Sequence, residues 1–321
     1  MDFLWRQLFK TPPHPEGNFA GKTVVVTGSN TGLGREAARH FARMGTSRLI
    51  LAVRSLEKGN AAKQDIESTT NCKDIQVWQL DMSSKESVQA FAHRASTELN
   101  RIDIFLANAG VARSKFNLVE RYEETIAVNV IYTFLLAALM MPKLKETANK
   151  YNIRPTFTVT GSDAYVFTKF PHRSEPHILS AMSDEKIFTQ YSGQQYPASK
   201  LLELWIVRAI TEQHPAKDLP VTLNIVTPGL CHSDLGRDRN TWSFWLLKLL
   251  LARSTEVGSR TLVHAGASGE ETHGKYLIDC GVEEPGEMVT GKEGREVQDR
   301  VAKEILEELE SIQLGVTKNF E

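Results

Sequence analysis

Residues 23–34 read TVVVTGSNTGLG, an apolar, β-branched run that passes directly into a glycine-rich turn. The run Thr23–Thr27 predicts a buried strand, and a helical pattern starts at Gly34. Glycines allow a tight turn and let backbone N–H groups approach a phosphate, whose charge the N-terminus of the next helix stabilises. This position between strand and helix predicts a nucleotide-binding turn, with a purely structural turn as the alternative; its residues are Gly28, Ser29, Asn30, Gly32, Leu33 and Gly34.

The same alternation of apolar runs and helical segments continues along most of the chain. Further strands are predicted at Arg48–Val53, Ile75–Leu80, Asp103–Ala107, Thr156–Thr160 and Val221–Val226, with a weaker seventh at Tyr276–Asp279. Helices are predicted at Gly34–Met44, Ser55–Ser68, Ser83 (in a capping box with Glu86) towards Leu99, Glu120–Thr147 and Pro197–Gln213. Strands that alternate with helices indicate an α/β Rossmann fold, a doubly wound parallel sheet of about seven strands with helices on both faces.

The domain organisation follows from the segments outside this alternation. Residues 1–20 carry three prolines and are predicted to form an extended lead-in. Neither a Gly/Ser linker nor a repeat divides residues 21–321, so we predict a single catalytic domain there, with a charged tail from about residue 281 and a helix at Val297–Ile312. Phe167–Gln195 is a polar insert before a helix.

A second unusual segment lies near residues 236–255, where aromatic and leucine residues concentrate at Trp242–Leu251. Both this segment and the polar insert are expected at the carboxyl edge of the sheet, where such folds bind ligands. We predict a substrate lid near 236–255; a buried helix, a subunit contact or a peripheral membrane contact are the alternatives.

Composition excludes several classes of protein. The chain has 321 residues, 41% hydrophobic and 24% charged, with a formal net charge of -1, so no attraction to nucleic acid is expected. Three widely spaced cysteines suggest neither a disulfide framework nor a zinc site. The N-terminal residues lack the features of a signal peptide, and the apolar stretch Trp242–Ala252 is too short for a transmembrane segment. These features favour a cytoplasmic protein.

The end of the second strand indicates which nicotinamide cofactor binds. An NAD enzyme needs an acidic residue there to accept a hydrogen bond from the ribose 2′-hydroxyl. This strand ends Ala52-Val53-Arg54-Ser55, and Arg54 is suited to pair with a 2′-phosphate instead. NADP(H) is therefore the predicted cofactor, with a solvated surface arginine as the alternative reading of Arg54.

The predicted catalytic group is Tyr196 with Lys200, in the sequence Tyr196-Pro197-Ala198-Ser199-Lys200. If a helix begins at Pro197, both side chains project from one face. A tyrosine with a pKa of about 10 is a poor acid at neutral pH, but an adjacent ammonium stabilises its phenolate. Tyr196 is predicted to exchange a proton with the substrate oxygen. Ser162, just beyond the fifth strand, is predicted to hold that oxygen; a loop or cap serine is the alternative.

The pattern TGxxxGxG at residues 27–34, with YxxxK at 196–200, resembles the short-chain dehydrogenase/reductase family over about residues 20–280. The resemblance implies that Asp81 and the backbone of Met82 face the adenine, that Asn129 kinks a helix and holds a relay water near Lys200, and that a loop after the sixth strand anchors the nicotinamide. It implies these further cofactor-binding residues: Asn108, Ala109, Gly110, Tyr196, Lys200 (on the nicotinamide ribose), Pro228, Gly229, Cys231 and Ser233. The alternative for Asp81 is a role at the start of the helix near Ser83. The alternative for Asn129 is a buried asparagine whose side-chain amide is hydrogen-bonded by backbone groups.

A narrower resemblance, in Thr11–Pro15 and Leu51–Gly59, is to fungal members of the retinol-dehydrogenase-like group, many of which act in secondary metabolism. The expected function is NADP-dependent reduction of a carbonyl, or oxidation of the alcohol, in a mainly apolar small molecule. A non-redox step on the same fold and a silent NADP sensor are the alternatives. The helix after Tyr196 is apolar on more than one face, so it is expected to pack against both the sheet and another surface. The family resemblance implies a subunit interface there, hence a homodimer or homotetramer.

Overall fold

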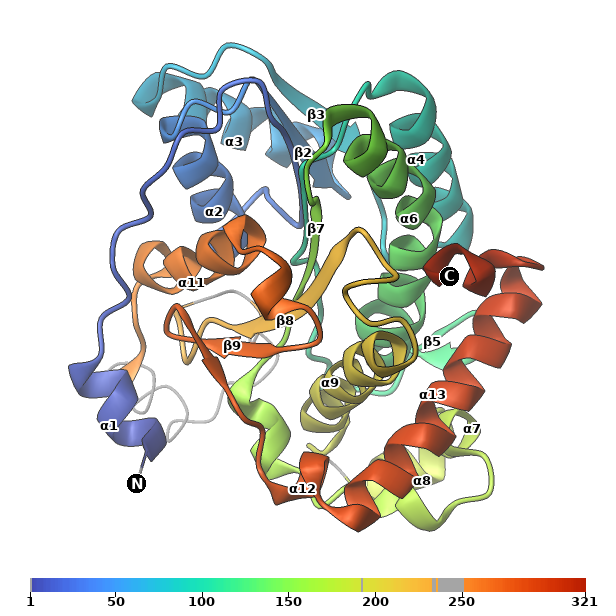
Figure 1. Cartoon of the computed structure of the whole chain (residues 1–321). Helices are drawn as coiled ribbons and strands as arrows, with labels where there is room; N and C mark the ends of the chain where they lie inside the picture. Colours follow the sequence, from blue (N-terminus) through green and yellow to red (C-terminus); the bar gives the residue numbers. More distant parts are fainter. Residues whose placement is uncertain (1, 192, 233–234, 236–250) are drawn as a thin grey trace.

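The computed structural model describes residues 2–191, 193–232, 235 and 251–321. Within these residues the main sheet has eight strands in the order β10-β9-β8-β7-β4-β1-β2-β3 (Figure 1). All neighbours pair in parallel except β10 with β9. The strands are β1 (Thr23–Thr27), β2 (Arg48–Val53), β3 (Ile75–Gln79), β4 (Ile104–Ala107), β7 (Thr156–Thr160), β8 (Thr222–Thr227), β9 (Tyr276–Ile278) and β10 (Gly281–Glu283).

This topology confirms the predicted Rossmann-type α/β fold. The seven predicted strands form the parallel part of the sheet, and β10 adds an eighth, antiparallel strand from the segment predicted as the tail. The chain leaves β1 towards β2 on one side and returns through β4 on the other. A parallel sheet opens a crevice at such a reversal, beyond the carboxyl ends of its strands.

Helices cover both faces of the sheet. The described helical segments are α1 (Asp2–Phe9), α2 (Gly32–Arg43), α3 (Leu56–Thr69), α4 (Lys85–Glu98), α5 (Glu124–Ile126), the π-helix η1 (Ala127–Ile131), α6 (Tyr132–Tyr151), η2 (Asp163–Phe167), η3 (Pro171–Ser174), α7 (Ile178–Met182), α8 (Glu185–Gln190), α9 (Gln195–Gln213), α11 (Thr255–Ala267), η5 (Glu270–Thr272), α12 (Glu287–Thr290), α13 (Lys292–Ile312) and η6 (Val316–Phe320). Side chains of α4, α6 and α9 form one apolar cluster with the sheet, and those of α2, α3 and α11 form the other.

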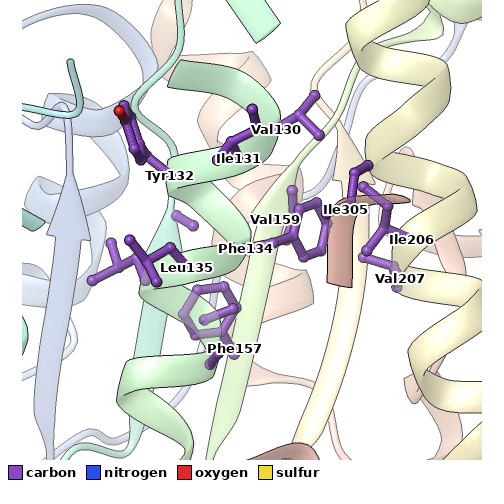
Figure 2. Close-up of a cluster of buried hydrophobic side chains, with 14 of the residues drawn as sticks. Val130, Ile131, Tyr132, Phe134, Leu135, Phe157, Val159, Ile206, Val207 and Ile305 are labelled. Atoms are coloured by element: carbon purple, nitrogen blue, oxygen red, sulfur yellow. The ribbon is translucent and has the colours of Figure 1, made fainter. Parts of the chain in front are cut away.

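Side chains of the strands alternate between the two clusters. On β1, Val25 joins the cluster with α6 and α9, whereas Val24 and Val26 join the cluster with α2 and α11. Phe105 of β4 and Phe157 of β7 stack with ring centroids 4.9 Å apart, and Figure 2 shows Phe157 beneath α6. Burial on both faces explains why the strands are continuously apolar in sequence.

The C-terminal helix α13 covers the outer side of α9. Ile305 lies beside Ile206 and Val207 in the larger apolar cluster (Figure 2). At the edge of this contact Gln298 accepts a hydrogen bond from Arg208 at 3.1 Å. The second apolar face of α9, from which we predicted homo-oligomerisation, is therefore packed against α13 of the same chain. This helix begins at Lys292, five residues before the predicted start.

The helix predicted over Glu120–Thr147 is divided in the structure. The π-helix η1 separates the short α5 from α6, and the preceding residues form a small hairpin of β5 (Leu118–Val119) and β6 (Tyr122–Glu123). Among the described residues, only the stretch 124–151 is long and apolar enough to cross a membrane, and 89% of its most apolar window is buried inside the fold. This burial identifies the stretch as a core helix.

Other local predictions also differ from the structure. Residues 2–9 of the lead-in form the helix α1 instead of extended chain. The N-cap of α4 is Ser84, whose side chain accepts from the Ser87 N–H, and not Ser83, which bonds to Asp81. Helix α9 begins at Gln195, two residues before Pro197. Pro197 still lies in the first turn, where its missing N–H costs no intrahelical hydrogen bond.

Tertiary contacts fix α1 against the sheet edge. The Gln7 amide donates to the carbonyl oxygens of Leu230 at 2.7 Å and Leu251 at 2.8 Å, and its oxygen accepts from the Leu230 N–H at 3.2 Å. Arg253 donates to the carbonyl oxygens of Arg6 and Lys10. An eight-residue helix is marginal in isolation. These contacts therefore account for a helix that local sequence does not predict.

Candidate active site

A cavity of about 790 Å³ lies at the carboxyl edge of the sheet. The segments that follow β1, β2, β3, β4, β7 and β8 contribute to its wall, together with the start of α9. The predicted site residues that line it are Gly28, Asn30, Gly32, Leu33, Arg54, Asp81, Met82, Asn108, Ala109, Gly110, Ser162, Tyr196, Lys200, Pro228, Gly229 and Cys231. The fold thus brings residues from seven separate stretches of sequence to one cavity.

The glycine turn is closely packed behind the cavity and open towards it. Gly28 has a φ of +63°, a conformation that favours glycine. A Cβ on Gly34 would lie 2.5 Å from Asn108 Nδ2 and 2.6 Å from the Gly28 carbonyl oxygen, so no larger residue fits. A Cβ on Gly32 would meet no described atom within 4 Å. This turn, at the N-terminus of α2, fits the pyrophosphate of a dinucleotide.

Ser29 supports the turn from within. Its side chain is fully buried and donates to the Val26 carbonyl oxygen at 2.9 Å. Thr27, which sequence reasoning did not single out, joins β1 to β4 because its hydroxyl accepts from the N–H groups of Asn108 and Ala109, both at 2.9 Å. The Asn108 amide donates back to the Thr27 carbonyl oxygen at 2.9 Å. In the sequence, the only sign of this role was the position of Thr27 directly before the first glycine of the turn.

The far end of the cavity carries positive charge. Arg54 is exposed and lines the cavity wall after β2, followed by Ser55. Lys58, also in the wall, belongs to the first turn of α3 and was not predicted. Two cations and the N-terminus of α3 at one corner are suited to a phosphate group.

Asp81 lines the same part of the cavity at the end of β3. Its Oδ1 accepts from the N–H and hydroxyl of Ser83, at 2.9 and 2.7 Å, and its own N–H donates to Ser87. These contacts organise the start of α4, which is the alternative that the sequence left open. The adenine-facing role of Asp81 and Met82 remains a prediction.

Tyr196 and Lys200 lie on the same face of α9, at the cavity. Lys200 Nζ is 5.7 Å from the centroid of the Tyr196 ring. The ammonium donates to the Thr160 carbonyl oxygen at 2.9 Å and contacts both oxygens of Glu203, at 2.8 and 3.1 Å. Glu203 is a buried residue of α9 that sequence reasoning missed, although its spacing of three from Lys200 was visible.

Ser162 lies in the cavity wall directly after β7. Its hydroxyl oxygen accepts from the Ala164 N–H at 3.1 Å, so the residue caps η2. Because a hydroxyl carries one proton of its own, this contact leaves the Ser162 O–H able to donate. Ser162 can therefore cap η2 and still make the predicted contact with a substrate oxygen.

Asn129 is fully buried in the π-helix η1, beneath the cavity. Its oxygen accepts from the Val111 N–H at 2.8 Å, and its amide donates to the Val111 carbonyl oxygen and the Ser199 hydroxyl. A Cβ on Gly110 would lie 3.2 Å from Asn129 Oδ1 and 3.9 Å from Lys200 Nζ. The side chain thus ties the strand β4 exit to α9, as expected of a buried asparagine. The relay water remains a prediction.

The loop after β8 contributes to the cavity wall, and its predicted contact with the nicotinamide remains a prediction. Pro228, Gly229 and Cys231 line the cavity, and the Cys231 thiol contacts the Pro228 carbonyl oxygen at 3.4 Å. A Cβ on Gly258 of α11 would lie 2.3 Å from this sulfur, so the thiol is packed against the helix. Ser233 and Trp242–Leu251, apart from Leu251, lie outside the described residues, as does most of the predicted lid.

Asp163 is a further cavity residue that the sequence did not indicate. Burial raises the pKa of this carboxyl, although it accepts a hydrogen bond from the Tyr276 hydroxyl. Its N–H donates to Thr227 at 3.1 Å. Asp163 therefore holds η2, and with it Ser162, against the ends of β8 and β9.

A parallel sheet with a glycine turn at its first strand and a tyrosine–lysine pair at the same edge defines a dinucleotide-binding oxidoreductase fold. Comparison with known proteins assigns the family. A model described as "short chain dehydrogenase" matches residues 22–150. The chain is 56% identical, over the full length of both, to the short chain dehydrogenase/reductase dmxR8 of Cryptosporiopsis sp.. The protein belongs to the short-chain dehydrogenase/reductase family.

Other similar proteins agree with this assignment. The short-chain dehydrogenase anuD of Penicillium roqueforti is 40% identical over 98% of this chain and 84% of its own. Among solved structures, the oxidoreductase yciK of E. coli has a TM-score of 0.61 at 20% identity, covering 85% of this chain and 99% of its own. A short chain dehydrogenase from Shigella flexneri, complexed with NADP, has a TM-score of 0.59 at 20% identity and covers 83% and 99%. These structures support the fold.

Proposed function

We propose that the protein is an NADP(H)-dependent oxidoreductase that reduces a carbonyl group, or oxidises the corresponding alcohol, of a mainly apolar small molecule. The carrying observation is that Tyr196, Lys200 and Ser162 line one cavity together with the glycine turn. The fungal origin of its relatives supports a role in secondary metabolism. Its place of action is proposed to be the cytoplasm.

The protein's own residues would divide the chemistry as follows. The bound cofactor supplies a hydride to the carbonyl carbon. Tyr196 donates its hydroxyl proton to the substrate oxygen, and the resulting phenolate is stabilised by the Lys200 ammonium. Ser162 donates a hydrogen bond to the same oxygen and shares its developing charge. In the oxidation direction the phenolate accepts the proton again.

The experiment that tests this function is NADPH turnover with a panel of aromatic aldehydes, quinones and ketones. We expect loss of NADPH absorbance with at least one member of the panel. Tight binding of NADPH without turnover of any member would favour the non-redox alternative. Binding of neither NADPH nor NADH would contradict the cofactor assignment as well.

The cofactor preference rests on Arg54, with Lys58 beside it in the cavity wall. A solved short chain dehydrogenase of the same fold is complexed with NADP, which supports the choice. Arg54→Asp replaces a cation by an anion, so we expect the ratio of kcat/KM for NADPH over NADH to fall by at least about tenfold. Arg43→Asp, at an exposed position of α2, makes the same charge change and is the control. An unchanged ratio in Arg54→Asp would remove Arg54 from the site.

A further inference from the structure

We propose that Glu203 is a positioning residue whose carboxylate keeps the Tyr196–Lys200 pair in its protonated, proton-donating form at mildly alkaline pH. The proposal rests on the proposed function, since it assumes that Tyr196 exchanges the proton. It assigns a role to the buried carboxylate nearest the predicted catalytic lysine, and it predicts that the site favours carbonyl reduction.

The geometry around Lys200 carries this proposal. Both oxygens of Glu203 contact Lys200 Nζ, at 2.8 and 3.1 Å, and the side chains are only 2% and 6% exposed. An ammonium has three protons. Lys200 Nζ donates to the Thr160 carbonyl oxygen, at 2.9 Å, and to each of the two Glu203 oxygens. Glu203 thus fixes the direction of Lys200 as well as its charge.

Other charged groups near α9 have partners of their own. On the cavity side, Asp163 of η2 accepts from Tyr276, and Tyr165 accepts from the Gly286 N–H. The segments η1 and β8 carry no titratable side chain. Glu124 of α5, which also lines the cavity, bonds to Arg113. Towards the ends of α9, Glu123 bonds to Gln195, while Arg208 and Glu212 bond to each other and to Gln298 of α13. Among the described residues, Glu203 is therefore the carboxylate that is paired with Lys200.

The charge of Glu203 and the charge of Lys200 depend on each other. Burial raises the pKa of Glu203 to about 7, against the opposing effect of Lys200. Burial lowers the pKa of Lys200, but the Glu203 carboxylate and Tyr196 together outweigh this effect and raise the pKa above the ordinary value. Above about pH 7 the carboxylate is therefore an anion beside the Tyr196–Lys200 pair.

An adjacent anion makes proton loss from the pair harder, whichever of the two groups releases the proton. In the reduction step the Tyr196 O–H bond breaks, a new O–H bond forms on the substrate oxygen, and the cofactor hydride reduces the carbonyl carbon. This step needs the protonated tyrosine. Glu203 therefore extends the pH range in which reduction proceeds.

The decisive variant is Glu203→Gln, which keeps the shape of the side chain and removes its charge. The kcat/KM for carbonyl reduction by NADPH is measured between about pH 6 and 10. We expect the alkaline limb of the profile to move to lower pH by about one unit. Glu203→Asp, which keeps the charge, should stay close to the wild type. Glu212→Gln, the same change at the exposed end of α9, is the matched control. If the alkaline limb of the kcat/KM profile of Glu203→Gln lay at the same pH as in the wild type, or at a higher pH, the proposal would be overturned.

A second measurement requires neither cofactor nor turnover, and it covers the case in which Glu203→Gln does not fold. Lys200→Met leaves Glu203 buried without its cation, so the pKa of the carboxyl rises further. A raised folded pKa contributes stability that is present below the unfolded value and is lost as pH rises through the folded one. Relative to wild type, Lys200→Met should therefore lose stability towards urea as pH increases from about 5 to 9.

The double variant Lys200→Met/Glu203→Gln should not show this dependence. Parallel stability curves for Lys200→Met and wild type would mean that Glu203 does not carry charge next to Lys200, and would overturn the proposal. A failure of the proposed function looks different. In that case no substrate is reduced, while the pH-dependent stability of Lys200→Met remains.

Discussion

Replacement of Tyr196 by phenylalanine is expected to lower kcat for carbonyl reduction by about 10²–10⁴-fold, with little change in the Kd for NADPH. The phenylalanine keeps the aromatic ring near Lys200 and removes only the hydroxyl that would donate the proton. Turnover followed by NADPH absorbance and affinity measured by fluorescence titration separate the two effects.

The matched control is Tyr165→Phe, in the neighbouring helix η2. The Tyr165 hydroxyl accepts from the Gly286 N–H at 3.4 Å, outside the cavity wall, so its removal should leave kcat nearly unchanged. If Tyr196→Phe retained most of the turnover, the proton would come from another group. If NADPH affinity fell in parallel with kcat, the role of Tyr196 would be binding.

The second large effect is expected from Gly34→Ala. The new Cβ would lie 2.5 Å from Asn108 Nδ2 and 2.6 Å from the Gly28 carbonyl oxygen, closer than such contacts allow. Because Asn108 also bonds to the Thr27 carbonyl oxygen, the whole turn must shift. We expect NADPH affinity to fall at least about tenfold and the free energy of unfolding to decrease by about 1–3 kcal/mol.

Gly286→Ala provides the control for this change. Gly286 has a φ of -61°, and its Cβ would meet no described atom within 4 Å. Isothermal titration calorimetry and urea denaturation should find this variant close to the wild type. Unaltered NADPH affinity in Gly34→Ala would mean that the turn does not hold the cofactor.

Local sequence was sufficient for the sheet and the glycine turn. The strands are continuous apolar runs because both their faces are covered, and the turn requires glycine for steric reasons at Gly28 and Gly34. The tyrosine–lysine spacing likewise depends only on the helical repeat. These features are encoded within a few consecutive residues.

Features that depend on distant contacts were missed. Helix α1 is held by Gln7 and Arg253, whose partners are more than two hundred residues away. The choice between two adjacent serines was missed for a local reason, because Ser83 bonds to Asp81, two residues earlier, and the Ser84 side chain caps α4. Glu203 appears as an ordinary helical glutamate until the burial of its position is known. The sequence pattern gives the spacing of residues along one helix. The burial of a residue on that helix depends on the elements that pack against it.

The packing of α13 on α9 has a consequence for how the enzyme behaves at low abundance. A subunit that covers α9 would dissociate on dilution, because its local concentration depends on the amount of protein present. A helix tethered to the same chain has an effective concentration set by its linker alone. The apolar outer wall of α9 is thus covered from the moment the chain has folded, and the geometry of Tyr196, Lys200 and Glu203 on that helix is supported by a single molecule.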